Sequence, residues 1–212
     1  MKKQGTGMVP KKAIQPLVDV IKRAQKETWE ARKKGEITQE HKITSSLATN
    51  IRRECRDVFK RLNLNIEVLC HNVHDKGPGV EESISGADIG ITLRVNKNEN
   101  IEKVGKVKTV LIQSKLPKNT KMDILENEIA HMVGVSGAGM NGSFVAVYNN
   151  NQTKVSTILD IENANYNANI AKVGSLKIFF KKFFSCHYGK RGLDSTDLRF
   201  KPKFYLEFIV NK

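Results

Sequence analysis

The chain has 212 residues, of which 39% are hydrophobic, enough for one domain with a substantial core. Its 36 lysines and arginines outnumber 22 acids, for a net charge of +14. Such an excess indicates a polyanionic partner, most often nucleic acid, with an unspecific basic surface as the alternative. The three cysteines form no Cys-x-x-Cys pair, and no run approaches about 18 apolar residues. The sequence therefore argues against a disulfide framework, a zinc ribbon and a membrane span, and we expect a cytoplasmic protein.

Two amphipathic helices are predicted in the first third of the chain. Apolar residues recur at helical spacing over 13–34, and Gly35 ends the pattern. A second apolar stripe runs over about 44–62, with Thr44 as its expected cap and basic residues on its other faces. Glu54 lies next to this stripe, where it would either pair with an arginine or turn inward as an additional acid at a metal site.

Strands and helices alternate in the rest of the chain. Because runs of β-forming residues are separated by helical patterns, we predict an α/β fold with helices on the faces of one sheet. Residues 1–40 would form a basic helical extension, and residues 41–212 the α/β domain. The expected strands cover 65–73, 88–95, 107–113, 142–148, 154–159 and 204–210, and the expected helices cover 121–135 and 175–186.

Polar residues lie at the ends of two of these strands. Asp88 opens one strand, and Gln113 and Lys115 end the next. Side chains two positions apart on a strand share a face, so Gln113 and Lys115 should point the same way. The 25 positions from Asp88 to Gln113 suit two antiparallel neighbours and their loop, which would bring Asp88 to the same edge. A carboxylate, an amide oxygen and an ammonium group can together hold a hard cation and orient water against a phosphate. Glu128, on the next helix, is also able to approach them.

This order of elements resembles the PD-(D/E)XK nuclease superfamily. The pattern is a strand with Asp88, then a strand that ends in Gln113-x-Lys115, with a helix before and after, and it spans residues 44–160 or about half of the chain. The resemblance implies a restriction-endonuclease-like fold, a mixed central sheet flanked by helices, in which a helix and a three-strand meander lead to the site. The chain departs from the usual motif because Ala87 replaces the proline before the aspartate, and Gln113 replaces the second acid.

The resemblance also implies a Mg²⁺ site and a catalytic lysine. Asp88 would bind Mg²⁺ through a carboxylate oxygen, with the Gln113 amide oxygen and the backbone carbonyl of Ser114 as further ligands. Glu82, six positions before Asp88, would supply a second carboxylate. Lys115 would stabilise the attacking hydroxide or the pentavalent phosphate. The candidate catalytic residues are therefore Asp88, Gln113, Lys115 and Glu82.

From this resemblance we expect a Mg²⁺-dependent endonuclease that hydrolyses DNA phosphodiester bonds, in restriction or anti-phage defence. The alternative is a catalytically inactive nuclease-fold subunit that binds nucleic acid within a larger complex, and Gln113 favours it. Cutting both strands with one site per chain would favour a homo-oligomer or a subunit of a defence complex.

The segment 172–212 is expected to grip the phosphate backbone, because it holds ten lysines and arginines against three acids. The candidate nucleic-acid-binding residues in it are Lys177, Lys181, Lys182, Lys190 and Arg191.

Overall fold

A computed structural model describes most of the chain and contains the sheet and helices that the sequence predicts. The described residues are 8–63, 65–72, 86–96, 106–117, 122–135, 137–149, 151–168, 171–172, 174–193, 202 and 204–211. The helices are α1 (Lys11–Lys33), α2 (Glu40–Arg61), α4 (Met122–Ala130), α5 (Ile158–Glu162) and α6 (Leu176–Phe184), and a π-helical turn, η1 (His131–Val135), follows α4. The strands are β1 (Ile66–Asn72), β2 (Ile89–Asn96), β3 (Val107–Lys115), β4 (Ser143–Tyr148), β5 (Thr153–Thr157), β6 (Gly174–Ser175), β7 (Lys190–Arg191) and β8 (Phe204–Asn211).

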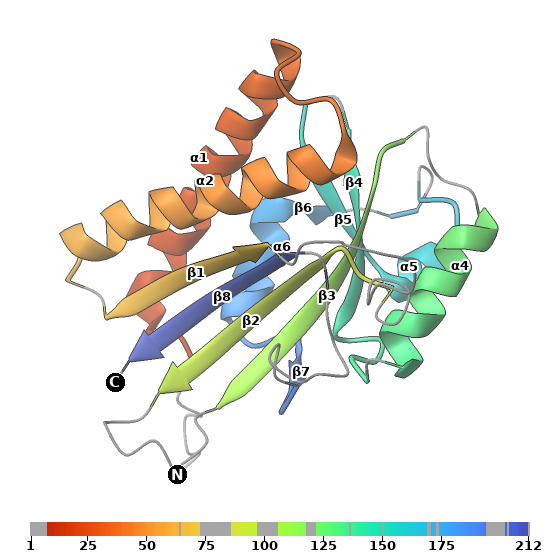
Figure 1. Ribbon diagram of the computed structural model, residues 1–212. Helices are drawn as coiled ribbons and strands as arrows, with labels where there is room; N and C mark the ends of the chain where they lie inside the picture. Colours follow the sequence, from red (N-terminus) through yellow and green to blue (C-terminus); the bar gives the residue numbers. More distant parts are fainter. Residues whose placement is uncertain are drawn as a thin grey trace.

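The strands form one mixed sheet with helices on both faces (Figure 1). The order is β1-β8-β2-β3-β4-β5-β6, with β7 paired to β3. The predicted antiparallel pairing of β2 and β3 is confirmed, with Ile89 opposite Ile112. The α/β class and the mixed sheet flanked by helices are therefore confirmed.

The predicted three-strand meander is wrong, because the last strand of the chain enters the middle of it. β8 lies between β1 and β2, antiparallel to β1 and parallel to β2. Its register places Phe204 opposite both Asn72 and Ile89. Phe204, Leu206 and Phe208 are buried, since a strand inside a sheet is covered by its neighbours and by the helices.

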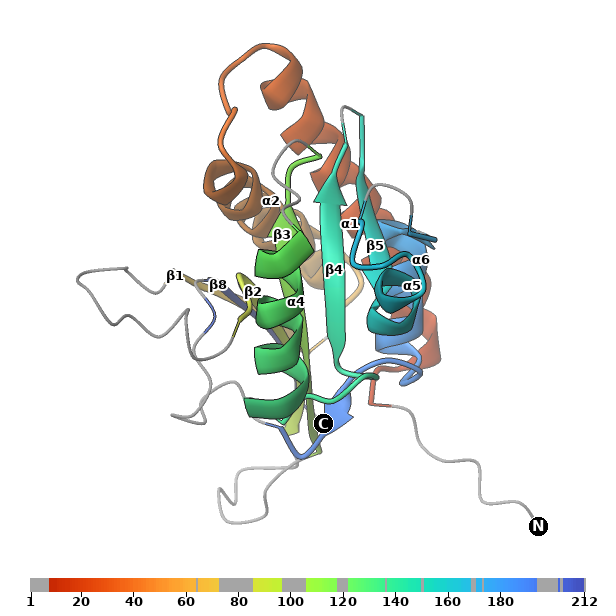
Figure 2. The same ribbon diagram turned by 90° about the vertical axis from the view of Figure 1, so that its right-hand side faces the viewer.

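Each face of the sheet packs against its own set of helices. α1, α2 and α6 cover one face, where the aromatic side chains of α6 meet Phe144 and Phe208. α4, η1 and α5 cover the other face through Leu125, Ile129 and Ile161. Figure 2 looks toward this second set, with α4 in front of the sheet. Two apolar layers thus enclose the sheet, as is usual for a domain of this class.

Three of the predicted elements differ from the structure by more than a shift of one or two residues at their ends. α2 begins at Glu40, four residues before the expected start, so Thr44 lies within the helix rather than at its cap. The predicted strand 154–159 ends at Thr157, whose side chain accepts a hydrogen bond from the backbone N–H of Asp160 and caps α5. The predicted helix 121–135 becomes α4 followed by a π-helical turn, a feature that is frequent at functional sites.

The predicted division after residue 40 coincides with the first residue of α2. α1 nevertheless contributes Leu17, Val18 and Ile21 to the same core as α2, α6 and the sheet. Among the described residues, no helix is both long and apolar enough to cross a membrane.

Candidate functional site

Asp88 lies at the point where β2 begins beside the end of β3. Its backbone N–H donates to the Ile112 carbonyl at 3.1 Å, which continues the ladder between the two strands. Asp88 is only 5% exposed, and its Oδ2 accepts hydrogen bonds from the Ser114 backbone N–H at 2.8 Å and the Ser114 hydroxyl at 2.7 Å. Two donors on one oxygen fix the orientation of the carboxylate.

Gln113 and Lys115 end β3 on the face that α4 covers. Both are buried, with 2% and 8% of their surface exposed, and alternation along the strand puts them on one face, as predicted. The Lys115 ammonium group lies 2.8 Å and 2.7 Å from the two carboxylate oxygens of Glu128 on α4. The structure therefore brings together Asp88, Gln113, Lys115 and Glu128.

Glu40 is the acid at this edge that the sequence analysis missed. It is the first residue of α2, and its Oε2 accepts a hydrogen bond from the Leu116 backbone N–H at 2.8 Å, directly after β3. Burial is the largest cause of the raised pKa of the Glu40 carboxyl, and the negative charge of Asp88 comes next. The positive charge of Lys115 opposes that rise in pKa, and Glu128 adds to it. The four charged groups therefore act on one another.

A chain of buried hydroxyl groups supports Asp88 from the opposite side. The Tyr148 hydroxyl lies 2.6 Å from the Thr44 hydroxyl, and Thr44 lies 3.5 Å from the hydroxyl of Ser114, which donates to Asp88. Burial raises the pKa of Tyr148, so its phenol stays protonated at neutral pH. Because a buried hydroxyl chain is costly to leave partly unpaired, this network holds α2, β3 and β4 in one arrangement around Asp88.

Gly86, two residues before Asp88, allows the chain to pass close to α4. Its φ is +63°, and a Cβ there would lie 2.2 Å from the Glu128 carbonyl oxygen. Only glycine fits both requirements without strain. The close approach places Asp88 and Glu128 at the same edge of the sheet.

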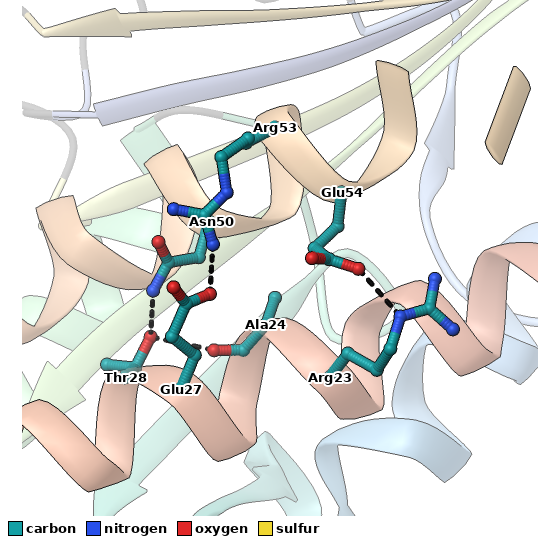
Figure 3. Close-up of polar contacts among 7 residues, drawn as sticks. All are labelled: Arg23, Ala24, Glu27, Thr28, Asn50, Arg53 and Glu54. Atoms are coloured by element: carbon teal, nitrogen blue, oxygen red, sulfur yellow. Dashed lines mark hydrogen bonds and ion pairs between the residues drawn. The ribbon is translucent and has the colours of Figure 1, made fainter. Parts of the chain in front are cut away.

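Two other predicted acids are not part of this group. Glu82 lies outside the described residues. Glu54 lies at the contact between α1 and α2, where it pairs with Arg23 at 2.6 Å (Figure 3). It is 14 residues beyond Glu40 on the same helix, which corresponds to about 21 Å at 1.5 Å per residue. Glu54 is thus paired with an arginine, one of the two roles expected for it, although the arginine belongs to α1.

The predicted nucleic-acid-binding residues are exposed, and two of them lie at the far end of β3 from this edge. Lys177, Lys181 and Lys182 project from α6, and Lys182 donates to the Tyr188 hydroxyl at 3.0 Å. Lys190 and Arg191 form β7, which pairs with Lys108 and Thr109 near the start of β3. The candidate site lies at the other end of that strand, about 20 Å away at 3.3 Å per residue.

The side chains around Asp88 suit a hard cation. Carboxylate oxygens of Asp88 and Glu40 and the amide oxygen of Gln113 are the donor type that Mg²⁺ prefers, and Mg²⁺ commonly binds proteins through one or two carboxylates while keeping several waters. Within the described ranges, no three His, Cys, Asp or Glu side chains lie close enough to form a complete metal cage. The backbone N–H of Ser114 bonds to Asp88, and the structure does not establish the predicted role of the Ser114 carbonyl as a ligand.

No protein-family model matches the chain, and comparisons with curated proteins and with solved structures give no significant match. The interpretation of the site therefore depends on its own geometry.

Proposed function

We propose that this protein is a Mg²⁺-dependent endonuclease that hydrolyses DNA phosphodiester bonds. The observation that carries the proposal is the meeting of Asp88, Gln113 and Lys115 on two antiparallel strands, with Glu40 and Glu128 brought in from two helices. Among the described residues, three carboxyl groups and one ammonium group lie near this sheet edge, in a chain of net charge +14. A divalent cation would offset the negative charge of these carboxyl groups.

Each side chain has a definite task in this proposal. The carboxylates of Asp88 and Glu40 would hold Mg²⁺, with the Gln113 amide oxygen beside them. The ion would act as a Lewis acid on the phosphate and lower the pKa of a bound water. Lys115 would stabilise the charge that develops on the attacking oxygen and the phosphate, and Glu128 would fix the direction of the lysine ammonium group.

Glu40 compensates for the missing acid at position 113. A neutral amide is a poorer ligand for Mg²⁺ than a carboxylate, and of the two further acids expected from the sequence Glu82 lies outside the described residues and Glu54 pairs with Arg23. The first turn of α2 places a carboxyl group next to the end of β3, where its pKa responds to Asp88. Glu40 is therefore our candidate for the second acid, in addition to Glu82.

A second function is favoured by one contact. The ammonium group of Lys115 is held by both oxygens of Glu128, so it is already paired before any phosphate arrives. A subunit that keeps the fold but not the activity would bind nucleic acid through the exposed lysines and arginines of the chain, and would not need Lys115 for catalysis. Restriction or anti-phage defence, and assembly into an oligomer or a defence complex, remain expectations of the nuclease proposal.

Plasmid DNA incubated with the protein in Mg²⁺ and in EDTA tests the proposal. We expect nicking or cutting only with Mg²⁺, and its loss in Lys115→Ala and Glu40→Gln. Glu36→Gln is the matched control, because Glu36 is exposed and lies just outside α2. Cleavage that survives Lys115→Ala would rule out this site, whereas DNA binding without cleavage would favour the binding subunit.

A further inference from the structure

Some basic residues of α2 form an ion pair with an acidic side chain, and others do not. Arg53 pairs with Glu27 of α1, and Glu54 pairs with Arg23 of α1, so charges alternate across the helix contact (Figure 3). Asn50 adds a hydrogen bond of 3.0 Å to the Thr28 hydroxyl. These charges serve the packing of α1 on α2.

Arg52, Arg56 and Lys60 form a second set, which we call the α2 stripe. They are spaced four residues apart, so they lie along one face of the helix. All three are exposed, and no ion pair joins any of them to another residue in the described part of the chain. Three positive charges on one face repel one another, which an anionic partner would relieve.

The α2 stripe lines a hollow of about 270 Å³ between α2 and β1. The other wall is formed by residues 66–69 of β1, among them the exposed Glu67. β1 is the first strand of the sheet order, so none of the described strands covers its outer side. Figure 1 shows α2 running along β1 at this open edge. The hollow is therefore basic along the helix and open at the strand.

We propose that the α2 stripe binds the phosphate backbone of a DNA duplex. Its three residues span about 12 Å along the helix axis, which corresponds to about three to four phosphate steps of one strand at a rise of about 3.4 Å. Arginine favours phosphate because its guanidinium group donates two parallel hydrogen bonds. The proposal deepens the nuclease assignment, because it names a surface that holds the substrate away from the site of cleavage.

The position of the stripe relative to the candidate site supports this role. Glu40 begins α2 at the candidate site, and Arg52 and Lys60 follow 12 and 20 residues later on the same straight element. At 1.5 Å per residue they lie about 18 Å and 30 Å from Glu40 along the axis. A duplex held by the stripe at one end of α2 would extend toward the acids at the other end. Lys177 and its neighbours on α6 do not belong to this surface.

The test is duplex binding in EDTA, where cleavage does not interfere. Fluorescence anisotropy of a labelled 30-base-pair duplex would be measured over a range of salt concentrations with the full chain. The triple variant Arg52→Gln, Arg56→Gln, Lys60→Gln should raise Kd at least tenfold at low salt and reduce the slope of log K against log salt by about 2 to 3, since each phosphate contact contributes about 0.9. Glutamine keeps a high helix propensity, so α2 should remain folded.

A matched triple variant on α1 provides the control. Lys22→Gln, Lys26→Gln, Lys33→Gln removes the same charge from exposed positions of another helix, and should change Kd less than about threefold and leave the slope unaltered. Equal losses in both triples would overturn the proposal, because net charge alone would then explain binding. If the stripe triple unfolds, which its thermal melt would reveal, the single variants Arg52→Gln and Arg56→Gln each have to reduce the slope by about 1 for the proposal to stand.

Failure of this inference and failure of the nuclease assignment are distinguishable. Loss of duplex binding in the stripe variant, with no cleavage by the parent protein in Mg²⁺, would support the stripe and contradict the nuclease. Cleavage by the parent protein in Mg²⁺, with unchanged duplex binding in the stripe variant, would support the nuclease and contradict the stripe. Binding of a polyglutamate peptide at the stripe, with duplex binding unchanged in the variant, would identify an acidic protein segment as the partner and overturn the proposal.

Discussion

Lys108 is a buried lysine whose effect on stability should depend on pH in a defined window. It lies on β3 with 1% of its surface exposed, and its ammonium group donates to the Tyr188 carbonyl at 3.0 Å and to the Phe183 carbonyl at the end of α6. The ring of Phe183 lies 4.3 Å from the same nitrogen. Burial is the largest cause of a pKa for Lys108 that is lowered from 10.5 to about 8, and the nearby charge of Arg191 lowers it further.

The direction of the effect follows from proton binding. Between about pH 8 and pH 10.5 the unfolded chain binds more protons at Lys108 than the folded chain does, so this residue makes the free energy of unfolding rise with pH. Integrating from pH 8 to pH 9.5 gives about 1.5 kcal/mol, since one pKa unit corresponds to about 1.4 kcal/mol. Burial also raises the pKa of Cys55 and Cys70, which makes stability fall with pH in the same range.

Lys108→Met isolates the contribution of the lysine, because methionine has a similar length and carries no charge. Urea unfolding at pH 8.0, 8.5, 9.0 and 9.5 would give the free energy of unfolding of both proteins. The contributions of Cys55 and Cys70 are common to both proteins and cancel in the difference. We expect the free energy of unfolding of the parent protein, measured relative to that of the variant, to rise by about 1.5 kcal/mol from pH 8 to pH 9.5. A difference that stays constant within about 0.3 kcal/mol would refute the argument, because the folded pKa would then equal the unfolded one.

Three further predictions concern the candidate site. Gly86→Ala should reduce the free energy of unfolding by about 2 kcal/mol or more in a urea melt, because its φ is positive and an added Cβ would lie 2.2 Å from the Glu128 carbonyl oxygen. The control Gly35→Ala, with φ +77° and no atom within 4 Å, should reduce the free energy of unfolding by less, and equal losses in the two variants would contradict the clash. Tyr148→Phe should cost about 1 kcal/mol in the same melt, because it removes the bond to Thr44, and an unchanged melt would rule that bond out as a stabilising contact. Mg²⁺ should raise the Tm of the parent protein but not of Glu40→Gln, and equal shifts would place the ion elsewhere.

The strand pair at the site could be predicted because its signals are local. Alternating apolar residues define β2 and β3, and 25 positions between Asp88 and Gln113 leave room for only a hairpin-like connection. The position of β8 could not be predicted in the same way. Its sequence specifies a buried strand, but the alternation of apolar residues contains no information on which two strands it will pair with.

Glu40 was missed because α2 begins without a strong capping signal. Gln39 occupies the cap position and makes no side-chain cap hydrogen bond, whereas Thr44 is the stronger capping residue by type. Thr44 instead bonds the Glu40 carbonyl within the helix and the Tyr148 hydroxyl beyond it. An acid in the first turn was the available signal, because the helix dipole stabilises negative charge there.

The charges at the site explain how the acidic edge and the basic chain fit together. The side chains of Glu40, Asp88 and Glu128 carry like charges near one another, and Lys115 pairs with Glu128. The raised pKa of Glu40 is a direct consequence, since burial and the charge of Asp88 both disfavour a second carboxylate. A divalent cation would reverse this balance by favouring the charged form of Glu40, so cation binding and proton release from that carboxyl would be coupled. A surface such as the α2 stripe would attract a polyanion that the acids alone would repel, and the cation would then let a phosphate approach them.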